Sequence, residues 1–350
     1  MHGKLVAYDG TEYEGVSFGA PTSVAGEVVF TTGMTGYPES LTDPSYAGQI
    51  LVLTYPLVGN YGVPEKTKWE SGRIHASALI VSSYNPTPSH YASTQSLSSW
   101  LKAEGVPGLE IKDTRALAQK IRTQGTMLGK VIVGKNGIAL RDPNKENLVA
   151  KVSTKKIISK GKGERTCVLI DCGAKRNIER ELLARGFRVT TVPWDCDIFK
   201  EKIPCDYLVV SNGPGDPKMC RETVAVIEKA MRKKIPILGI CLGNQLLALA
   251  AGGDTYKLKF GHRGQNHPVK MEGTEKCFLT TQNHGFAITK APRGFREWFK
   301  NANDGTNEGI IHRTRPWMSV QFHPESAPGP LDTEWVFDYF LARAGKKKPR

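Results

Sequence analysis

No cysteine precedes position 167 in this 350-residue chain, and no run of about 18 apolar residues occurs in it. We therefore expect no membrane-spanning helix. Residues 1–10 contain no continuous apolar core, so we also expect no signal peptide and a cytoplasmic protein. The hydrophobic content of 39% is sufficient for two ordinary domains, each with a core of its own.

The number of cysteines is seven, which is odd, and no two of them stand in C-x-x-C spacing. In a chain of this length, that pattern argues against a disulfide framework and against a zinc site. His262 and His267 are close in sequence, but no cysteine or carboxylate cluster completes a ligand set around them. We expect no metal in this chain.

Two nucleotide-binding patterns are also missing from the sequence. It contains no G-x-x-x-x-G-K-[ST] loop and no G-x-G-x-x-G segment after a predicted strand. We therefore expect no nucleotide cofactor in this chain.

Acidic residues are fewer than basic ones, and the formal net charge is +14. Much of the excess is concentrated in residues 151–165 and 345–350, and such runs are typical of solvated linkers and tails. No aromatic-studded basic strand, helix-turn-helix signature or zinc finger accompanies them. A basic surface that meets an acidic partner subunit explains the charge equally well, so we expect no nucleic acid as a partner.

The second half alternates predicted strands with predicted helices. This alternation indicates an α/β fold with a mostly parallel sheet flanked by helices. Shorter strands and a final helix follow. In chain order, the predicted strands are 166–171, 187–193, 207–210, 235–240, 277–284, 308–314 and 317–323, and the predicted helices are 174–186, 221–234, 242–253 and 332–344.

The first half reads differently, with short strand signals, many turn residues and few segments of helical length. It predicts a compact α+β domain, with strands at 27–33, 49–56 and 77–83 and helices at 93–105 and 114–125. We place an N-terminal domain at 1–150, a basic linker at 151–165 and the α/β domain at 166–350.

Cys241 lies between a predicted buried strand and a predicted helix, in the segment Gly239–Gly243, which reads G-I-C-L-G. This is the thiol counterpart of a nucleophile elbow, a tight turn that needs its glycines because neighbouring strands crowd it. The turn lifts the sulfur to the carboxyl end of the sheet, where the N-terminus of the helix favours the thiolate. A small buried cysteine at the end of a core strand is the alternative explanation.

His323 follows another predicted strand, with Glu325 two residues later and Pro324 between them. A nucleophilic thiol needs an imidazole base, and the imidazole needs a carboxylate to fix its tautomer and orientation. An exposed histidine in a turn is the alternative, but it gives no reason for a cysteine elbow in the same chain.

Gly213 and Gly215 enclose a proline directly after the strand 207–210. A Gly-Pro-Gly turn at the carboxyl edge of a parallel sheet exposes backbone N–H groups. Together with the N–H of Leu242, these suit an oxyanion hole. Alone, such a turn is also common in ordinary loops.

Cys241, His323 and Glu325, in that order on an α/β domain, resemble the class I (triad) glutamine amidotransferases, and residues 166–343 fit that family. Within it, the chain resembles the family of carbamoyl-phosphate synthetase small subunits. The segments that carry this narrower resemblance are 211–217, 239–253, 260–269, 282–287, 308–314 and 323–330, together with 36–62 and 113–129 in the first half.

The resemblance implies a role for each matching residue. Cys241 would be the nucleophile, His323 the base and then the acid, and Glu325 the residue that orients it. Further positions match residues that contact glutamine or the oxyanion: Ser45, Gly213, Gly215, Leu242, Gln245, Asn283, Gly285 and Phe286. Two small departures are Asn244, where many relatives carry histidine, and Gly264-Gln265.

The resemblance also implies partners and a reaction. Glutamine would be hydrolysed to glutamate and ammonia. The large subunit of carbamoyl-phosphate synthetase would then use that ammonia with ATP and bicarbonate, in arginine or pyrimidine biosynthesis. ATP and metal ions are expected on the large subunit, and the first domain, 1–150, is expected to dock it. Three alternatives remain at this point: an anthranilate or GMP synthetase partner, an independent cysteine hydrolase, and a non-enzymatic nucleic-acid binder.

Overall fold

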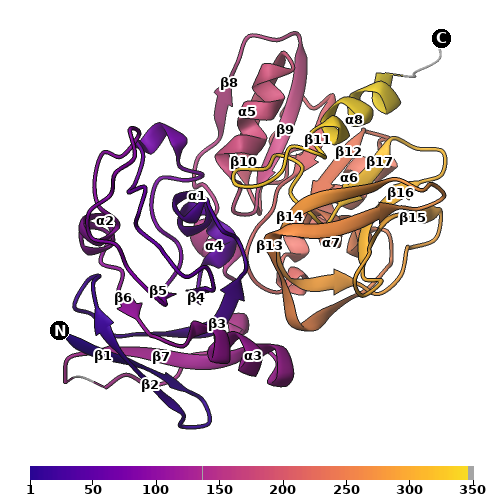
Figure 1. The fold of residues 1–350 in the computed structure, drawn as a ribbon. Helices are drawn as coiled ribbons and strands as arrows, with labels where there is room; N and C mark the ends of the chain where they lie inside the picture. The colour runs from indigo at the N-terminus through magenta and orange to yellow at the C-terminus, as the bar shows by residue number, and fades with distance from the viewer. Residues whose placement is uncertain (136, 346–350) are drawn as a thin grey trace. The chain divides into compact units, whose positions relative to one another are not determined.

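The computed structural model describes residues 1–135 and 137–345, in two compact units (Figure 1). One unit comprises Met1–Leu148 together with Lys259–Arg263, and the other comprises Val149–Leu258 and the chain from Gly264 onward. Of the basic tail predicted at 345–350, residues 346–350 lie outside the described residues.

A closed barrel of seven strands forms the first unit, in the order β1-β2-β6-β5-β4-β3-β7. The pairs β3–β4, β4–β5 and β5–β6 are parallel, and the remaining pairs are antiparallel. The strands are β1 (His2–Ala7), β2 (Glu12–Ser17), β3 (Val24–Thr31), β4 (Gln49–Leu53), β5 (Ala78–Val81), β6 (Gly108–Glu110) and β7 (Met127–Val133).

Alternate residues of these strands pack into two separate cores, as the two-residue period of a strand requires. Val28 joins residues of the other strands in one apolar cluster, and its neighbour Val29 packs with Trp100 of α2 in a second cluster. The helical segments of this unit are α1 (Tyr37–Thr42), η1 (Pro44–Tyr46), η2 (Lys66–Lys68), α2 (Leu97–Ala103), α3 (Thr114–Gln124) and η3 (Pro143–Lys145).

The three strands and two helices predicted in the first half are confirmed as β3, β4, β5, α2 and α3. The sequence missed β1, β2, β6 and β7, for physical reasons. Strand β2 has no fully buried residue, β6 has three residues, and in β7 one of the buried positions is Gly129 and one of the half-buried positions is Lys130. Such segments lack a strong apolar signal, although closure of the barrel requires them.

A sheet of ten strands forms the second unit, in the order β14-β13-β15-β16-β17-β12-β11-β9-β10-β8. Its centre, β17-β12-β11-β9-β10, is parallel, whereas β8, β15 and β16 pair antiparallel with their neighbours. The strands are β8 (Ile158–Lys160), β9 (Arg165–Asp171), β10 (Phe187–Pro193), β11 (Tyr207–Val210), β12 (Ile237–Ile240), β13 (Thr255–Met271), β14 (Cys277–Ile288), β15 (Phe295–Asn301), β16 (Asn307–His312) and β17 (Trp317–Val320).

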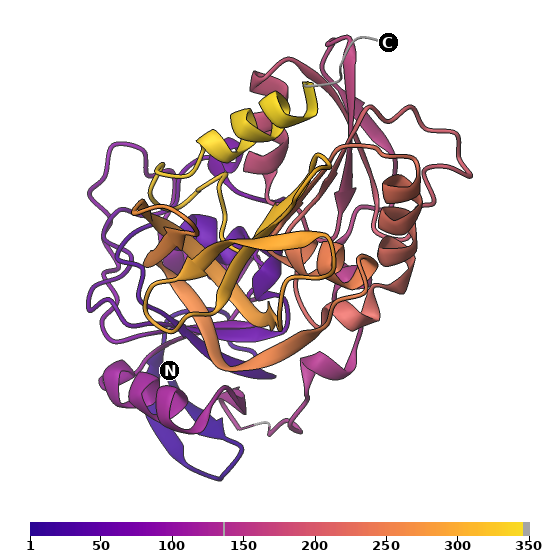
Figure 2. The ribbon, with the colours of Figure 1, turned by 90° about the vertical axis from the view of Figure 1, so that its right-hand side faces the viewer.

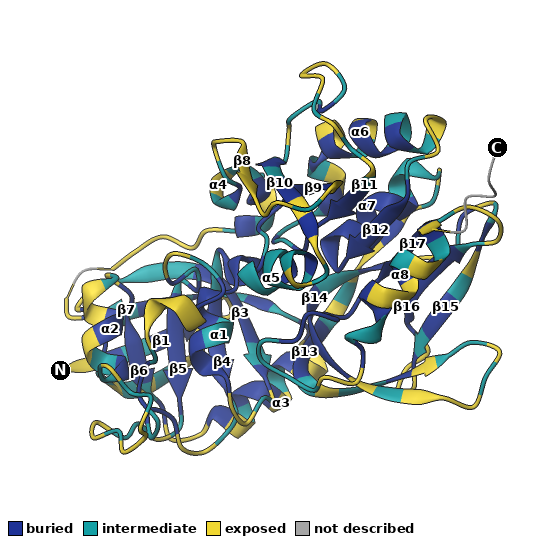
Figure 3. Cartoon of the chain, turned by 90° about the horizontal axis from the view of Figure 1, so that it is seen from above, coloured by how far each residue is buried: buried dark blue, intermediate teal, exposed yellow. Residues whose placement is uncertain are grey.

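Helices cover both faces of the parallel strands (Figure 2). Val168 and Val210 pack with residues of α6 and α7, whereas Leu169 and Val209 pack with residues of α5 and α8. The central strands are accordingly buried (Figure 3). The helical segments of this unit are α4 (Val149–Val152), α5 (Arg176–Ala184), η4 (Pro217–Met219), α6 (Arg221–Arg232), α7 (Leu242–Ala250) and α8 (Trp335–Gly345). The predicted α/β fold is confirmed.

Residues 151–165, predicted to be a basic linker, carry regular structure in part. Strand β8 pairs antiparallel with β10, and Asp171 Oδ2 accepts a hydrogen bond of 2.7 Å from the backbone N–H of Thr154. All three residues of β8 are exposed, which explains why the sequence shows no apolar strand there. Across residues 1–135 and 137–345, no helix combines the length and the apolar character needed to cross a membrane.

Candidate active site

Cys241 lies in the turn between β12 and α7, at the carboxyl end of the parallel sheet. Its φ of 55° is in the left-handed region, which is rare for a residue with a side chain and is typical of a nucleophile elbow. The residue is 1% exposed. Its sulfur lies 3.7 Å from the carbonyl oxygen of Asn283 and 3.6 Å from Nε2 of Gln321.

The two glycines that flank this cysteine are required by close backbone packing. A Cβ on Gly239 would lie 2.3 Å from the carbonyl oxygen of Gly243, and one on Gly243 would lie 2.1 Å from that of Val210. Both distances are far below van der Waals contact, so no larger residue fits without movement of the backbone. The G-x-C-x-G pattern therefore reflects the geometry that presents the thiol.

His323 and Glu325 form a buried pair just beyond β17. Nδ1 of the imidazole and Oε1 of the carboxylate are 2.6 Å apart, and both side chains are essentially inaccessible to solvent. This contact fixes the tautomer with the proton on Nδ1. The other ring nitrogen, Nε2, is buried and has no oxygen or nitrogen partner among the described residues, but the Cys241 sulfur is close enough to raise the pKa of the ring.

The electrostatics of this pair favour the charged forms of both groups. Burial lowers the pKa of His323, but the Glu325 carboxylate and the Cys241 sulfur outweigh it and raise the pKa to about 10. Burial raises the pKa of Glu325, but the charges of Lys175 and His323 outweigh it and lower the pKa to about 2. The imidazole is therefore able to carry a proton, and the ionised Glu325 carboxylate stabilises its charged form.

This pair should make stability depend on pH in a defined window. The folded pKa of His323 lies above the ordinary value of 6.5, so its contribution is complete below pH 6.5 and is lost as pH rises toward about 10. We expect the free energy of unfolding of the wild-type chain to fall more steeply across that window than that of His323→Asn. Urea unfolding at intervals from pH 6 to 10 measures the difference, and parallel curves would contradict the assignment.

Lys175 is a buried cation that the sequence reading missed. It is 2% exposed, its Nζ lies 3.0 Å from Oε1 of Glu325, and it also donates to the carbonyl of Ser326. Asn212 Oδ1 accepts a hydrogen bond of 3.0 Å from the Lys175 backbone N–H. The only signal in the sequence was a lysine shortly after the carboxyl end of a core strand, and lysines in loops are too common to single it out.

The Gly-Pro-Gly turn and the elbow are neighbours. A Cβ on Gly213 would lie 2.1 Å from the carbonyl oxygen of Cys172 and 2.9 Å from Cδ2 of Leu242. Gly215 has a φ of 85°, which favours glycine. The structure thus brings the two predicted oxyanion segments together.

The remaining predicted glutamine-binding residues of this unit cluster around α7 and β14. Gln245 donates a hydrogen bond of 2.9 Å from Nε2 to the carbonyl oxygen of Phe286, and Asn283 contacts Cys241 through its own carbonyl. Gly285 lies between Asn283 and Phe286 on β14. The backbone of Asn283 therefore contacts the thiol, and Gln245 of α7 is bonded to the same strand three residues further on.

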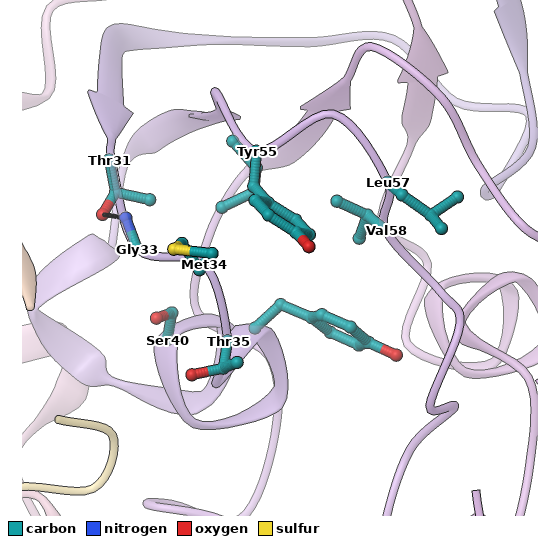
Figure 4. A pocket seen from close by; sticks show the side chains of 10 residues that line it. Thr31, Gly33, Met34, Thr35, Ser40, Tyr55, Leu57 and Val58 are labelled. Atoms are coloured by element: carbon teal, nitrogen blue, oxygen red, sulfur yellow. Dashed lines mark hydrogen bonds between the residues drawn. The ribbon is translucent and has the colours of Figure 1, made fainter.

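Ser45 belongs to the first unit, where it lies on η1 and is buried. Its backbone N–H donates a hydrogen bond of 2.9 Å to Oδ1 of Asp43. A pocket of the same unit lies at the ends of β3 and β4 and at α1, and Ser45 is not among its lining residues (Figure 4). Those residues are Thr31, Gly33, Met34, Thr35, Tyr37, Ser40, Leu53, Tyr55, Leu57 and Val58.

Models of known protein families match both halves of the chain. Residues 168–343 match the family model of the class-I glutamine amidotransferases. Residues 5–131 match the model of the carbamoyl-phosphate synthase small chain, CPSase domain.

Three curated relatives are similar over nearly the whole chain. Multifunctional protein CAD of Squalus acanthias is 49% identical over 95% of this chain and 16% of its own length. Multifunctional protein pyr-3 of Neurospora crassa is 47% identical over 97% of this chain and 21% of its own length. The carbamoyl phosphate synthase arginine-specific small chain of Neurospora crassa is 45% identical over 95% of this chain and 78% of its own length. The chain thus spans about a fifth or less of the two multifunctional relatives and most of the small chain.

Proposed function

Because this chain belongs to the class-I glutamine amidotransferases, in the family of carbamoyl-phosphate synthase small chains, we propose that it hydrolyses glutamine to glutamate and ammonia for carbamoyl phosphate synthesis. The observation that carries the proposal is a thiol at a strained elbow beside a buried imidazole–carboxylate pair. The match of residues 5–131 favours this function over the alternative of an anthranilate or GMP synthetase partner.

The first step is attack on the side-chain amide of glutamine. The Cys241 sulfur forms a bond to the amide carbon, and the negative charge moves to the amide oxygen. Backbone N–H groups of Leu242 and Gly213 are the donors that stabilise this oxyanion. His323 then gives a proton to the departing nitrogen, the C–N bond breaks, and ammonia leaves.

The second step is hydrolysis of the γ-glutamyl thioester. His323, now neutral, takes a proton from a water molecule, which attacks the same carbon. The C–S bond breaks, glutamate is released, and the imidazole and thiolate return to their starting forms. Glu325 keeps Nδ1 protonated throughout, so that Nε2 alone exchanges the catalytic proton.

Glutamine is recognised by groups around the thiol. Gln245, Asn283, Gly285 and Phe286 supply amide and backbone groups of the pocket, and Ser45 and Gly215 are assigned to it by the family resemblance. The two steps above need neither a metal nor a nucleotide, and we assign ATP and metal ions to the large chain.

Labelling with an electrophilic glutamine analogue tests the function directly. We expect it to modify Cys241 ahead of the other six cysteines, because this thiol alone has the glutamine pocket and the His323 base. Peptide mapping identifies the site, and an excess of glutamine should protect it. Cys277, the exposed cysteine on β14, serves as the internal control for nonspecific alkylation. Preferential labelling there, unaffected by glutamine, would contradict the proposal.

We assign the docking of a large synthetase chain to the first unit. This unit has two apolar cores of its own but contributes no part of the Cys-His-Glu triad, and a domain without chemistry of its own is suited to binding a partner. Hydrogen exchange of the full chain, with and without the large chain, measures the contact. We expect new protection within residues 1–148, and protection confined to residues 149–345 would reject the assignment.

A further inference from the structure

Behind the Cys241 sulfur lies a chain of hydrogen-bonded side chains that the triad does not use. Ser319 Oγ donates to Oδ1 of Asn244 at 2.7 Å, and Nδ2 of Asn244 donates to Oε1 of Gln321 at 3.1 Å. Gln245 Nε2 donates to the same Gln321 oxygen at 3.1 Å. Gln321 Nε2 then lies 3.6 Å from the Cys241 sulfur. All the polar side chains of this relay are 2% exposed or less.

The orientation of the Gln321 amide follows from the hydrogen bond between Gln245 and a backbone carbonyl, a group that can only accept a hydrogen bond. The backbone carbonyl of Phe286 cannot donate, so the side-chain atom of Gln245 that contacts it must be the NH₂ group. The second proton of that NH₂ group points to Gln321, and the atom that receives it must be the oxygen. The NH₂ group of Gln321 is therefore the end that faces sulfur.

The hydrogen bonds of Asn244 are consistent with this orientation of Gln321. Since Gln321 presents its oxygen, Asn244 must present its NH₂ group to it, and this leaves Oδ1 of Asn244 to accept from the Ser319 hydroxyl. Two donors thus converge on one oxygen. A rotation of the Gln321 amide by 180° would break both bonds and leave buried polar groups unsatisfied, which is costly.

We propose that Gln321 is a catalytic residue that donates an N–H hydrogen bond to the Cys241 thiolate, and that Asn244 is a positioning residue that holds Gln321 in this orientation. Hydrogen bonding to the charged form of an acid favours that form. The relay would therefore increase the fraction of thiolate without accepting or releasing a proton itself. Its role in turnover rests on the proposed glutaminase function, whereas its effect on the thiol does not.

Three titratable groups share this environment and must be kept constant in a test. His323 interacts electrostatically with the sulfur, and Glu325 and Lys175 lie behind it. Gln321, Asn244 and Ser319 do not titrate, so a change caused by them must act through the sulfur. A histidine at position 244 would serve the same purpose as Asn244, because an imidazole N–H can donate to the same Gln321 oxygen.

The test is the rate at which iodoacetamide alkylates Cys241 in the full chain, measured by peptide mapping across a pH series. We expect Gln321→Leu to move the alkylation profile of Cys241 to higher pH by about one unit, a tenfold change in the thiolate fraction. Asn244→Leu should move it in the same direction by less, because Gln245 still holds Gln321. Asn244→His should restore the wild-type profile. The value of kcat/KM for glutamine should fall about tenfold in Gln321→Leu.

Gln282→Leu is the matched control, because it removes an equally buried amide from β14 that bonds to Thr280 and His284 instead of the sulfur. In this variant, the pH dependence of Cys241 alkylation should be the same as in the wild-type chain. An unchanged profile in Gln321→Leu would overturn the proposal, even if activity fell, because a merely structural role lowers turnover without changing the thiolate. A shifted profile in a chain that does not hydrolyse glutamine would support the relay and reject the glutaminase function.

Discussion

Replacing Cys241 by serine is expected to abolish glutamine hydrolysis, with a loss on the order of 10⁴-fold or more. A hydroxyl is a much weaker nucleophile than a thiolate, and the imidazole of His323 lies in a site built around the larger sulfur atom. The measurement is glutamate release from glutamine by the purified full chain, compared with wild type at equal concentration.

Two controls make this result specific. Cys277→Ser changes the exposed cysteine of β14 and should leave the rate unchanged. In a complex with a large synthetase chain, Cys241→Ser should retain carbamoyl phosphate synthesis from free ammonia, because that reaction bypasses the thiol. Appreciable glutamine hydrolysis by Cys241→Ser would remove this residue from the nucleophile role.

The second large effect is expected at the base. His323→Asn should lower the glutaminase rate by about 10³-fold or more, since it removes proton transfer to ammonia and from water. Glu325→Gln should cost less, because the imidazole remains and loses only the charge that orients it and raises its pKa. Steady-state kinetics with glutamine measure both variants.

His312→Asn offers a matched histidine control at the end of β16, where Nδ1 of His312 accepts from the backbone N–H groups of Thr314 and Arg315. It should leave the glutaminase rate close to wild type. If Glu325→Gln were more damaging than His323→Asn, the roles of the two residues would have to be reassigned.

The sequence was informative about the triad because each member follows a strong local signal. Cys241 stands between glycines that close packing demands, and His323 and Glu325 flank one proline after a core strand. The carboxyl ends of parallel strands meet at one edge of a sheet, so residues 82 positions apart could be expected to lie together.

Lys175 and Gln321 could not be found in this way. Their functions depend on contacts across the sheet, with Glu325 and with Cys241, and nothing in their immediate sequence requires those contacts. The barrel of the first unit was equally hidden, because four of its seven strands are short, exposed on one face or interrupted by glycine. Only ring closure gives those segments partners for their backbone groups.

The course of strand β13 has a consequence for how this protein can be divided. Its middle segment, Lys259–Arg263, belongs to the barrel unit: Lys259 accepts a hydrogen bond of 2.8 Å from Thr126, and the Phe260 ring stacks against Phe30. A cut between residues 148 and 149 would therefore leave the barrel without a piece that remains covalently attached to the other fragment. The two fragments would therefore complement each other, and neither can be moved into another protein as a complete domain. A chain cut at this point should keep its two fragments associated until the barrel itself unfolds.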